Sequence, residues 1–237
     1  MARILALDPG LTRATLDAAA AVSVTAVVQL STAAVYGAWA DNAAPLTEEE
    51  PIRPNPGLPR VAAAAESERL VAEWRDGHPG IRAVVLRPAL TLAAGRPAFP
   101  AAGLDGIEGV GIGDLARRVQ FLHVDDLAAA IAHAVTHDLD GAYNVAPDGW
   151  ITEEAARAVA GTPARFSAPG WMLRIRRRRP SDPYRQHGWV VANDRIRATG
   201  WEPLSTNEGA RVRTRPPTSW QRIPPARKQE VALGPTA

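Results

Sequence analysis

Residues Val24–Leu30, VTAVVQL, and the segment directly after them, Ser31–Gly37, STAAVYG, decide the fold class of this chain. The first segment is continuous and rich in β-branched residues, a pattern typical of a strand buried on both faces of a parallel sheet. The second segment changes to small and polar residues and ends in glycine. We therefore predict a buried strand with a polar turn at its carboxyl end.

Segments with helical and strand patterns alternate on both sides of this strand. We predict helices, the last two capped by Asp125 and Thr152, at residues 11–22, 61–76, 126–137 and 152–160. Further strands are predicted at residues 2–7, 82–86, 121–124 and 142–146. Irregular structure is predicted at 91–118 and after 161, apart from short elements near 190–200. The alternation indicates an α/β fold with a mostly parallel sheet.

Composition limits the chemistry of the chain. Its 237 residues, 46% of them hydrophobic, are enough for a buried core, and the absence of cysteine excludes disulfides and thiolate chemistry. The five histidines show no metal-type spacing such as His-Glu-x-x-His, so no metal is expected. No apolar run reaches the roughly 18 residues of a membrane span. The start, MARILALDPG, does not resemble a secretory signal, so a cytoplasmic location is expected.

The most basic feature is the run Arg174–Arg179, RIRRRR, in a chain whose net charge is only +2. Such a run suits nucleic acid, an anionic ligand or a membrane surface, or forms a solvated helix end that pairs with acidic residues of the same chain. No helix-turn-helix, zinc-finger or RNA-recognition signature accompanies it. We therefore prefer the last interpretation and expect neither nucleic acid nor a membrane as partner.

Several polar segments follow predicted strands. The turn Ser31–Gly37 follows the first strand, Arg87 and Pro88 follow the strand at 82–86, and His123 ends the strand at 121–124. In an open parallel sheet the ligand crevice lies beyond the carboxyl ends of the strands. We therefore treat these segments as one candidate site.

A series of ordered segments carries a resemblance to a known family. The segments are TRATLDAAAAVSVTAVVQLSTAAVYG, PLTEEEPIRPNP, ESERLVAEW, AVVLRPAL, FLHVDDLAAAI, GAYNVA and NDRIRATGWEP. From about Thr12 to about Leu233 the chain resembles the extended short-chain dehydrogenase/reductases, the NAD-dependent epimerase/dehydratase family. The resemblance implies an incomplete Rossmann-like core at 1–160 with a loop insertion at 91–118. It also implies a loop-rich, substrate-side region with a basic tail at 161–237.

The resemblance also implies roles for individual residues. Thr32 stands where relatives carry the Ser or Thr that polarises the substrate oxygen, and it is our catalytic candidate. The candidates for cofactor binding are Ser31, Arg87 and Pro88, and those for the substrate pocket are Ala33, Tyr36, Arg60 and His123.

The chain departs from the family at its acid/base pair. In relatives, a Tyr-x-x-x-Lys pair supplies a tyrosine as acid/base and a lysine that holds the cofactor ribose. Aligning the family's Asn-Pro-x-x-x-Tyr-x-x-x-Lys-x-Glu with residues 55–66 places Arg60 and Ala64 at these two positions. Because the pKa of arginine lies above about 12, Arg60 does not replace the tyrosine as proton donor. Normal redox activity is therefore not expected.

Two further departures concern ligands. The family's glycine-rich turn, which binds the cofactor pyrophosphate, has no counterpart before Thr12, and Gly103–Gly109, GLDGIEG, has the context of a loop. Val119 occupies the place of an arginine that grips diphosphate in nucleotide-sugar members, with Arg118 next to it. NAD(P) is therefore implied by family resemblance only, tight cofactor binding is not expected, and a nucleotide-sugar substrate is not supported.

Two classes of function remain open. We favour a pseudoenzyme that binds a small molecule, with anions among the candidates, or regulates an intact partner. The alternative is an enzyme with nicotinamide-independent chemistry at Thr32, helped by Arg60 or Tyr36, or one with residual NAD(P)-dependent oxidoreductase or epimerase activity. Relatives dimerise through the helices that match 11–22 and 61–76. A homodimer, or a heterodimer with a full-length relative, is therefore expected.

Overall fold

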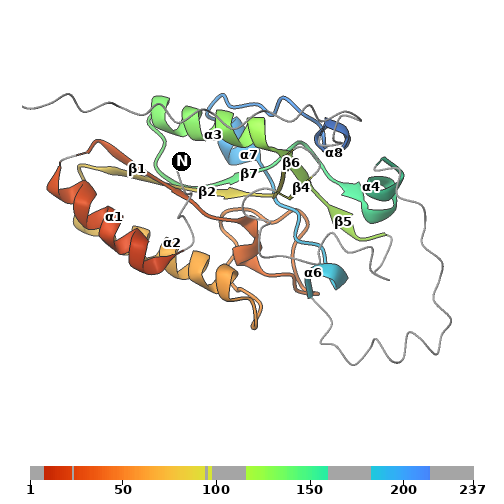
Figure 1. Cartoon of the computed structure of the whole chain (residues 1–237), viewed down its shortest axis with the longest axis horizontal. Helices are drawn as coiled ribbons and strands as arrows, with labels where there is room; N and C mark the ends of the chain where they lie inside the picture. The colour runs from red at the N-terminus through yellow and green to blue at the C-terminus, as the bar shows by residue number, and fades with distance from the viewer. Residues whose placement is uncertain (1–7, 23, 94–95, 98–115, 160–182, 214–237) are drawn as a thin grey trace, which may run out of the picture.

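The computed structural model describes residues 8–22, 24–93, 96–97, 116–159 and 183–213. Its centre is a three-stranded parallel sheet in the order β1-β2-β7. The strands are β1 (Ala26–Leu30), β2 (Arg82–Pro88) and β7 (Gly141–Val145). Helices lie on both faces of this sheet (Figure 1). The α/β class with a parallel sheet and flanking helices, predicted from the sequence, is confirmed.

Helices α1 (Pro9–Ala21) and α2 (Pro59–Gly77) cover one face of the sheet. Leu16 of α1 and Leu70 and Val71 of α2 pack there against β2, in a cluster with Ala83 and Val85. Both helices were predicted, but each begins two residues earlier than expected. Proline explains the difference, because it stands at the first position of each helix, where its missing N–H is not needed.

The N-terminal end of α1 differs from the prediction. The sequence Asp8-Pro-Gly opens the helix, and Asp8 is its N-cap, accepting a hydrogen bond from the backbone nitrogen of Leu11 at 2.8 Å. The strand predicted at residues 2–7 lies outside the described residues. Of β1, only the last two residues are buried, and within the described part of the chain no strand pairs with its outer edge. The prediction of a strand buried on both faces therefore holds only for its carboxyl end.

Helix α3 (Val124–Thr136) covers the opposite face of the sheet and packs Leu127, Ala130 and Ala134 into the main core. Its N-cap is His123, whose Nδ1 accepts from the backbone nitrogen of Asp125 at 3.2 Å. The prediction that Asp125 caps this helix was wrong, because the helix starts at Val124. Asp125 instead lies in the first turn, where its negative charge interacts favourably with the positive end of the helix dipole.

A smaller group of strands lies beside the central sheet. Strands β3 (Leu90–Ala93), β4 (Arg96–Pro97) and β6 (Phe121–His123) form one sheet, and β5 (Arg118–Val119) pairs with β8 (Ile151–Thr152). The prediction of irregular structure at 91–118 was therefore wrong for residues 91–93, 96–97 and 118, since strands this short give no periodic pattern. Helix α4 (Glu153–Val159) follows β8, and Thr152 Oγ1 accepts from Ala155 N at 3.1 Å, as expected of a cap.

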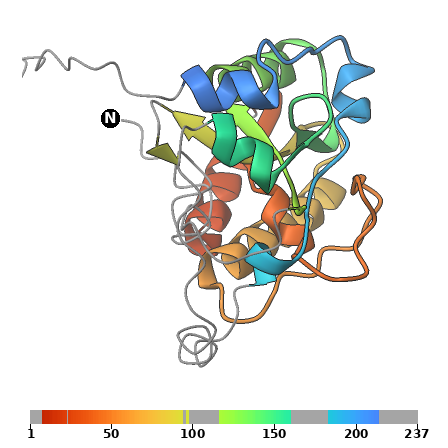
Figure 2. The same ribbon diagram turned by 90° about the vertical axis from the view of Figure 1, so that its right-hand side faces the viewer.

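The described C-terminal segments pack on the core. They include α6 (Pro183–Gln186), α7 (Asp194–Arg197) and α8 (Asn207–Arg213). Of these, α7 lies in the range where short elements were predicted, whereas α6 and α8 were not predicted. Helix α8 lies next to α4 (Figure 2). Val191, Ile196 and Trp201 are members of the main hydrophobic cluster. Leu46 forms backbone hydrogen bonds of 2.8 Å with Val190 and with Ala192. Residues 103–109 and 174–179 lie outside the described residues, and the division at residue 160 stays a prediction.

Two features are absent from the described residues. None of the helices in this part of the chain is both long and apolar enough to cross a membrane. Nor do three or more histidine, aspartate or glutamate side chains gather there as a metal site would require.

Candidate functional site

The polar turn after β1 forms the first part of the site. Thr32 Oγ1 accepts from Ala34 N at 3.1 Å and thereby caps the short 3-10 helix η1 (Ala33–Tyr36). Gly37 ends the turn with a φ of 73°, and a Cβ atom there would lie only 2.2 Å from the carbonyl oxygen of Arg53. Only glycine therefore fits this position, and the turn carries Tyr36 into the interior.

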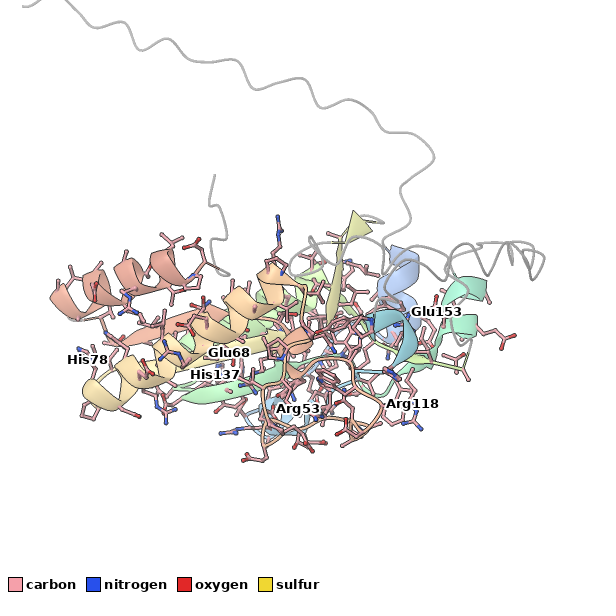
Figure 3. All side chains as sticks on the ribbon, turned by 90° about the horizontal axis from the view of Figure 1, so that it is seen from below. Arg53, Glu68, His78, Arg118, His137 and Glu153 are labelled. Carbon is pink, nitrogen blue, oxygen red and sulfur yellow. The ribbon has the colours of Figure 1, made fainter. Side chains whose placement is uncertain are left out.

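A buried ion pair lies beside this turn. Arg87, at the end of β2, donates from Nη2 and Nε to Glu68 Oε2 at 2.7 and 3.0 Å, and the two side chains are only 8% and 4% exposed. Ser31 Oγ donates to the other carboxylate oxygen of Glu68. Glu68 comes from α2 (Figure 3), so helix and strand ends are joined by one polar cluster.

Tyr36 extends this cluster towards β7. Its hydroxyl group accepts from Arg87 Nη1 at 2.7 Å and donates to Asn144 Oδ1 at 2.9 Å. Asn144 in turn donates to the Leu46 carbonyl at 3.3 Å and, from its backbone, to Glu48 at 2.7 Å. Each described polar group in this chain of contacts therefore has a protein partner.

The electrostatics of the cluster follow from burial and from the ion pair. Burial raises the pKa of Tyr36, although the charge of Arg87 acts in the opposite direction. For Arg87, burial acts to lower the pKa, but the Glu68 carboxylate outweighs it and the pKa is raised. Tyr36 therefore keeps its proton and Arg87 its charge at neutral pH.

The remaining predicted site residues lie outside this polar cluster. Thr32, Ala33 and Pro88 are buried at the strand ends, next to the cluster in sequence. His123 is also buried and serves as the cap of α3. Arg60 is exposed on the first turn of α2. The structure thus brings Ser31, Tyr36 and Arg87 together and leaves Arg60 at the surface.

Three site residues were missed by the sequence analysis: Glu68, Asn144 and Tyr184. Glu68 was detectable in principle, because it stands four residues after Ala64 and so faces the same side of α2. Asn144 and Tyr184 gave no signal, since their partners lie 108 and 150 positions away in the sequence.

Tyr184 is the least expected member of the site. Its ring is fully buried with Ala34, Ala38 and Val61, and its hydroxyl group donates to the Ala34 carbonyl at 2.7 Å. Trp189 meets the ring edge-on, with 5.5 Å between centroids. A side chain from the last quarter of the chain therefore packs directly on the turn that follows Thr32.

Two hollows lie near this region. The first, about 20 Å³ and thus room for about one water, is lined by Ala89, Leu90, Val119, Gln120, Trp189 and Val190. Gln120 bonds to the backbone of Gly149 and Val191, and Arg118 lies over the Trp150 ring at 5.3 Å. The second is a groove of about 600 Å³ between α2 and the sheet. Alanine and valine side chains form much of its lining, together with the charged residues Glu66, Glu68, Arg69, Arg75 and Arg87.

The sheet, its flanking helices and the polar turns at the strand ends define a Rossmann-like α/β protein. The model of the NAD dependent epimerase/dehydratase family matches residues 4–146, more than half of the chain, and the chain therefore belongs to this family. The resemblance drawn from the sequence is confirmed. A search of curated proteins finds no match.

Solved structures agree on the fold. UDP-N-acetylglucosamine 4-epimerase from Methanobrevibacter ruminantium matches with a TM-score of 0.64 at 20% identity, over 86% of this chain and 66% of that chain. UDP-glucose 4-epimerase from Thermus thermophilus, in complex with NAD, matches with a TM-score of 0.63 at 22% identity. The match covers 86% of this chain and 67% of that chain. dTDP-glucose 4,6-dehydratase from Bacillus anthracis, also in complex with NAD, matches with a TM-score of 0.60 at 18% identity. This match covers 86% of this chain and 64% of that chain. The chain thus spans about two thirds of their length.

Proposed function

We propose that this chain is a family member without normal redox activity, a scaffold that acts by associating with another copy or with a full-length relative. The proposal rests on the burial and the hydrogen bonds of the polar groups at the strand ends. Ser31, Tyr36 and Arg87 are buried, and their polar atoms bond to one another or to Glu68 and Asn144. A substrate would have to displace these contacts.

The two positions of the family's acid/base pair support the same proposal. Arg60 carries a guanidinium group, which holds its proton at neutral pH and so does not act as a general acid. Ala64 is 0% exposed and ends in a methyl group, so it offers no ammonium group to a cofactor ribose. The raised pKa of Tyr36 disfavours that residue as a substitute acid.

The packing of Tyr184 on the strand-end turn adds to this argument. In an active relative we expect substrate to reach the Ser or Thr of this turn. Here a buried ring covers Ala34, two residues after Thr32. Thr32 itself is 2% exposed, and its hydroxyl oxygen already caps η1.

The first test is calorimetric titration of the full chain with NAD⁺, NADP⁺, NADH and NADPH. We expect no binding tighter than millimolar, because an alanine replaces the ribose-binding lysine. Micromolar binding by the unmodified chain would overturn the proposal and favour an NAD(P)-dependent oxidoreductase or epimerase.

The association is expected to use the groove beside α2, whose exposed lining is mostly apolar. We predict that the chain self-associates and that the double variant Ala62→Glu/Ala72→Glu weakens self-association at least about tenfold, because two carboxylates would be buried in an apolar contact. Sedimentation equilibrium measures the effect. Ala128→Glu, an exposed position on α3, is the matched control. A wild-type chain that stays monomeric when alone, and also when mixed with a full-length relative, contradicts the proposed association.

A further inference from the structure

Two arginines from distant parts of the sequence meet at one end of the groove beside α2. Arg75 stands in the last turn of α2, whose middle and end are marked by the labels of Glu68 and His78 in Figure 3, and Arg195 comes from α7. A Cβ atom on Gly141 would lie 3.6 Å from Arg75 Nη1 and 3.5 Å from Arg195 Nη2. Gly141 has a φ of 88°, which favours glycine, so no side chain separates the two guanidinium groups.

The carboxylates near these arginines hold them only loosely. Arg75 Nη1 lies 3.7 Å from Asp140 Oδ2, beyond hydrogen-bond distance, and the other oxygen of Asp140 accepts from Ala83 N at 2.9 Å. Arg195 Nη1 lies 3.4 Å from Glu49, whose side chain is 86% exposed. Both arginine side chains are 43% exposed. Exposed contacts of this kind contribute little, so a ligand can replace them at small cost.

The other charged side chains of the groove are paired with one another. Glu68 pairs with Arg87 at 2.7 Å, and Glu66 pairs with Arg69 at 2.6 Å. Arg75 is the remaining charged residue of the described lining. The lining therefore carries an excess of positive charge, which lies at the end where α2 meets the start of β7.

The rest of the groove is suited to an apolar body. Ala62, Ala65 and Ala72 line it from α2, and Val85 and Ala142 line it from the sheet. At about 1.5 Å per residue, the helix axis extends about 20 Å between positions 62 and 75. An extended hydrocarbon chain of ordinary length therefore fits along the helix, starting from the arginines.

We propose that this groove binds a long-chain carboxylate, with its carboxylate group between Arg75 and Arg195 and its apolar chain along α2. Ligand sites are mostly apolar, measure about 300–1,000 Å³ and use a few polar groups to orient the ligand, and the groove measures about 600 Å³. Guanidinium groups match the geometry of a carboxylate. Because Asp140 and Glu49 lie close by, a singly charged head group is repelled less than a doubly charged phosphate.

The binding site goes beyond the proposed association, although the two share the groove. A bound chain occupies apolar surface that a second copy is expected to bury. On the basis of the proposed function, the carboxylate should shift the self-associated chain towards the monomer, which sedimentation equilibrium measures. Binding that depends on both arginines in a chain that is always monomeric would overturn the association and support the binding site.

The deciding experiment is calorimetric titration of the full chain at pH 7 with sodium decanoate and, separately, with decan-1-ol. We expect one equivalent of decanoate to bind in the micromolar range. The alcohol has the same chain without the charge and should bind at least about tenfold more weakly, because it forms no charge-assisted hydrogen bonds. Sodium phosphate, which has no apolar chain, should also bind more weakly than decanoate.

Variants of the two arginines test the position of the carboxylate. Arg75→Gln and Arg195→Gln should each lower the affinity for decanoate at least about tenfold, with unfolding midpoints in urea close to that of the unmodified chain. Arg197→Gln is the matched control, because it removes the same charge from α7 at a residue that pairs with Asp148 and Glu202. It should bind decanoate as the unmodified chain does. Three results would each overturn the proposal: no decanoate binding, equal binding of decan-1-ol, or unchanged affinity in both Arg75→Gln and Arg195→Gln.

Discussion

Replacing Glu68 with glutamine is expected to destabilise the fold by about 3–5 kcal/mol, because it leaves the charge of Arg87 buried without its counterion. The substitution keeps the shape of the side chain, so the loss comes from charge and hydrogen bonding. Glu68 also holds Ser31 in place, and the variant weakens that contact too. Urea unfolding followed by circular dichroism measures the change in the free energy of unfolding.

Glu66→Gln is the matched control for this experiment. Glu66 stands on the same helix and pairs with Arg69 at 2.6 Å, but that pair is exposed to solvent. Exposed pairs contribute little, so the unfolding midpoint should stay nearly unchanged. Equal effects of the two variants would show that the buried pair does not hold α2 to β2. The pair Glu68→Gln/Arg87→Met should recover part of the loss, because it removes the unpaired charge as well.

Introducing a lysine at position 64 is expected to cost at least about 3 kcal/mol at pH 7, since Ala64 is fully buried. The longer side chain overfills the contact between helix and sheet, and its ammonium group loses hydration. Restoring the family's lysine therefore requires changes in its surroundings as well. Thermal and urea unfolding of Ala64→Lys measure the cost, with Ala128→Lys on the exposed side of α3 as control.

The pH dependence of this variant has a definite sign. Burial lowers the pKa of a lysine in the folded state below its unfolded value of about 10.4. The penalty is therefore fully present below the folded pKa and decreases as the pH rises towards the unfolded value. Unfolding at pH 7 and pH 9.5 should show a smaller difference from the unmodified chain at the higher pH. A difference that is independent of pH would indicate that overfilling alone is responsible.

Much of the fold could be predicted from local patterns. The β-branched run before Ser31 and its alternation with the helical segments α1, α2 and α3 predicted a mostly parallel sheet with flanking helices. The boundaries were less accurate, because proline at the start of α1 and α2 and the His123 cap of α3 depend on backbone geometry. Strands as short as β3 and β5 carry no periodicity and were missed.

The site was less predictable than the fold. Ser31, Tyr36 and Arg87 were named from the sequence, but their shared partner Glu68 was not. Tyr184 was missed because packing between distant segments leaves no local pattern.

The contacts between residues 42–46 and 188–192 bear on how the chain folds during its synthesis. Asn42 donates to the carbonyl of Gly188, 146 positions later, and Leu46 bonds to the backbone on both sides of Val191. Contacts of such high sequence separation slow folding, because a long loop must close before they form. On the ribosome, the segment around Leu46 emerges long before its partners do. The early part of the core therefore keeps apolar surface exposed until the last quarter of the chain has been synthesised. We expect chaperones to affect the yield of folded protein most during this period.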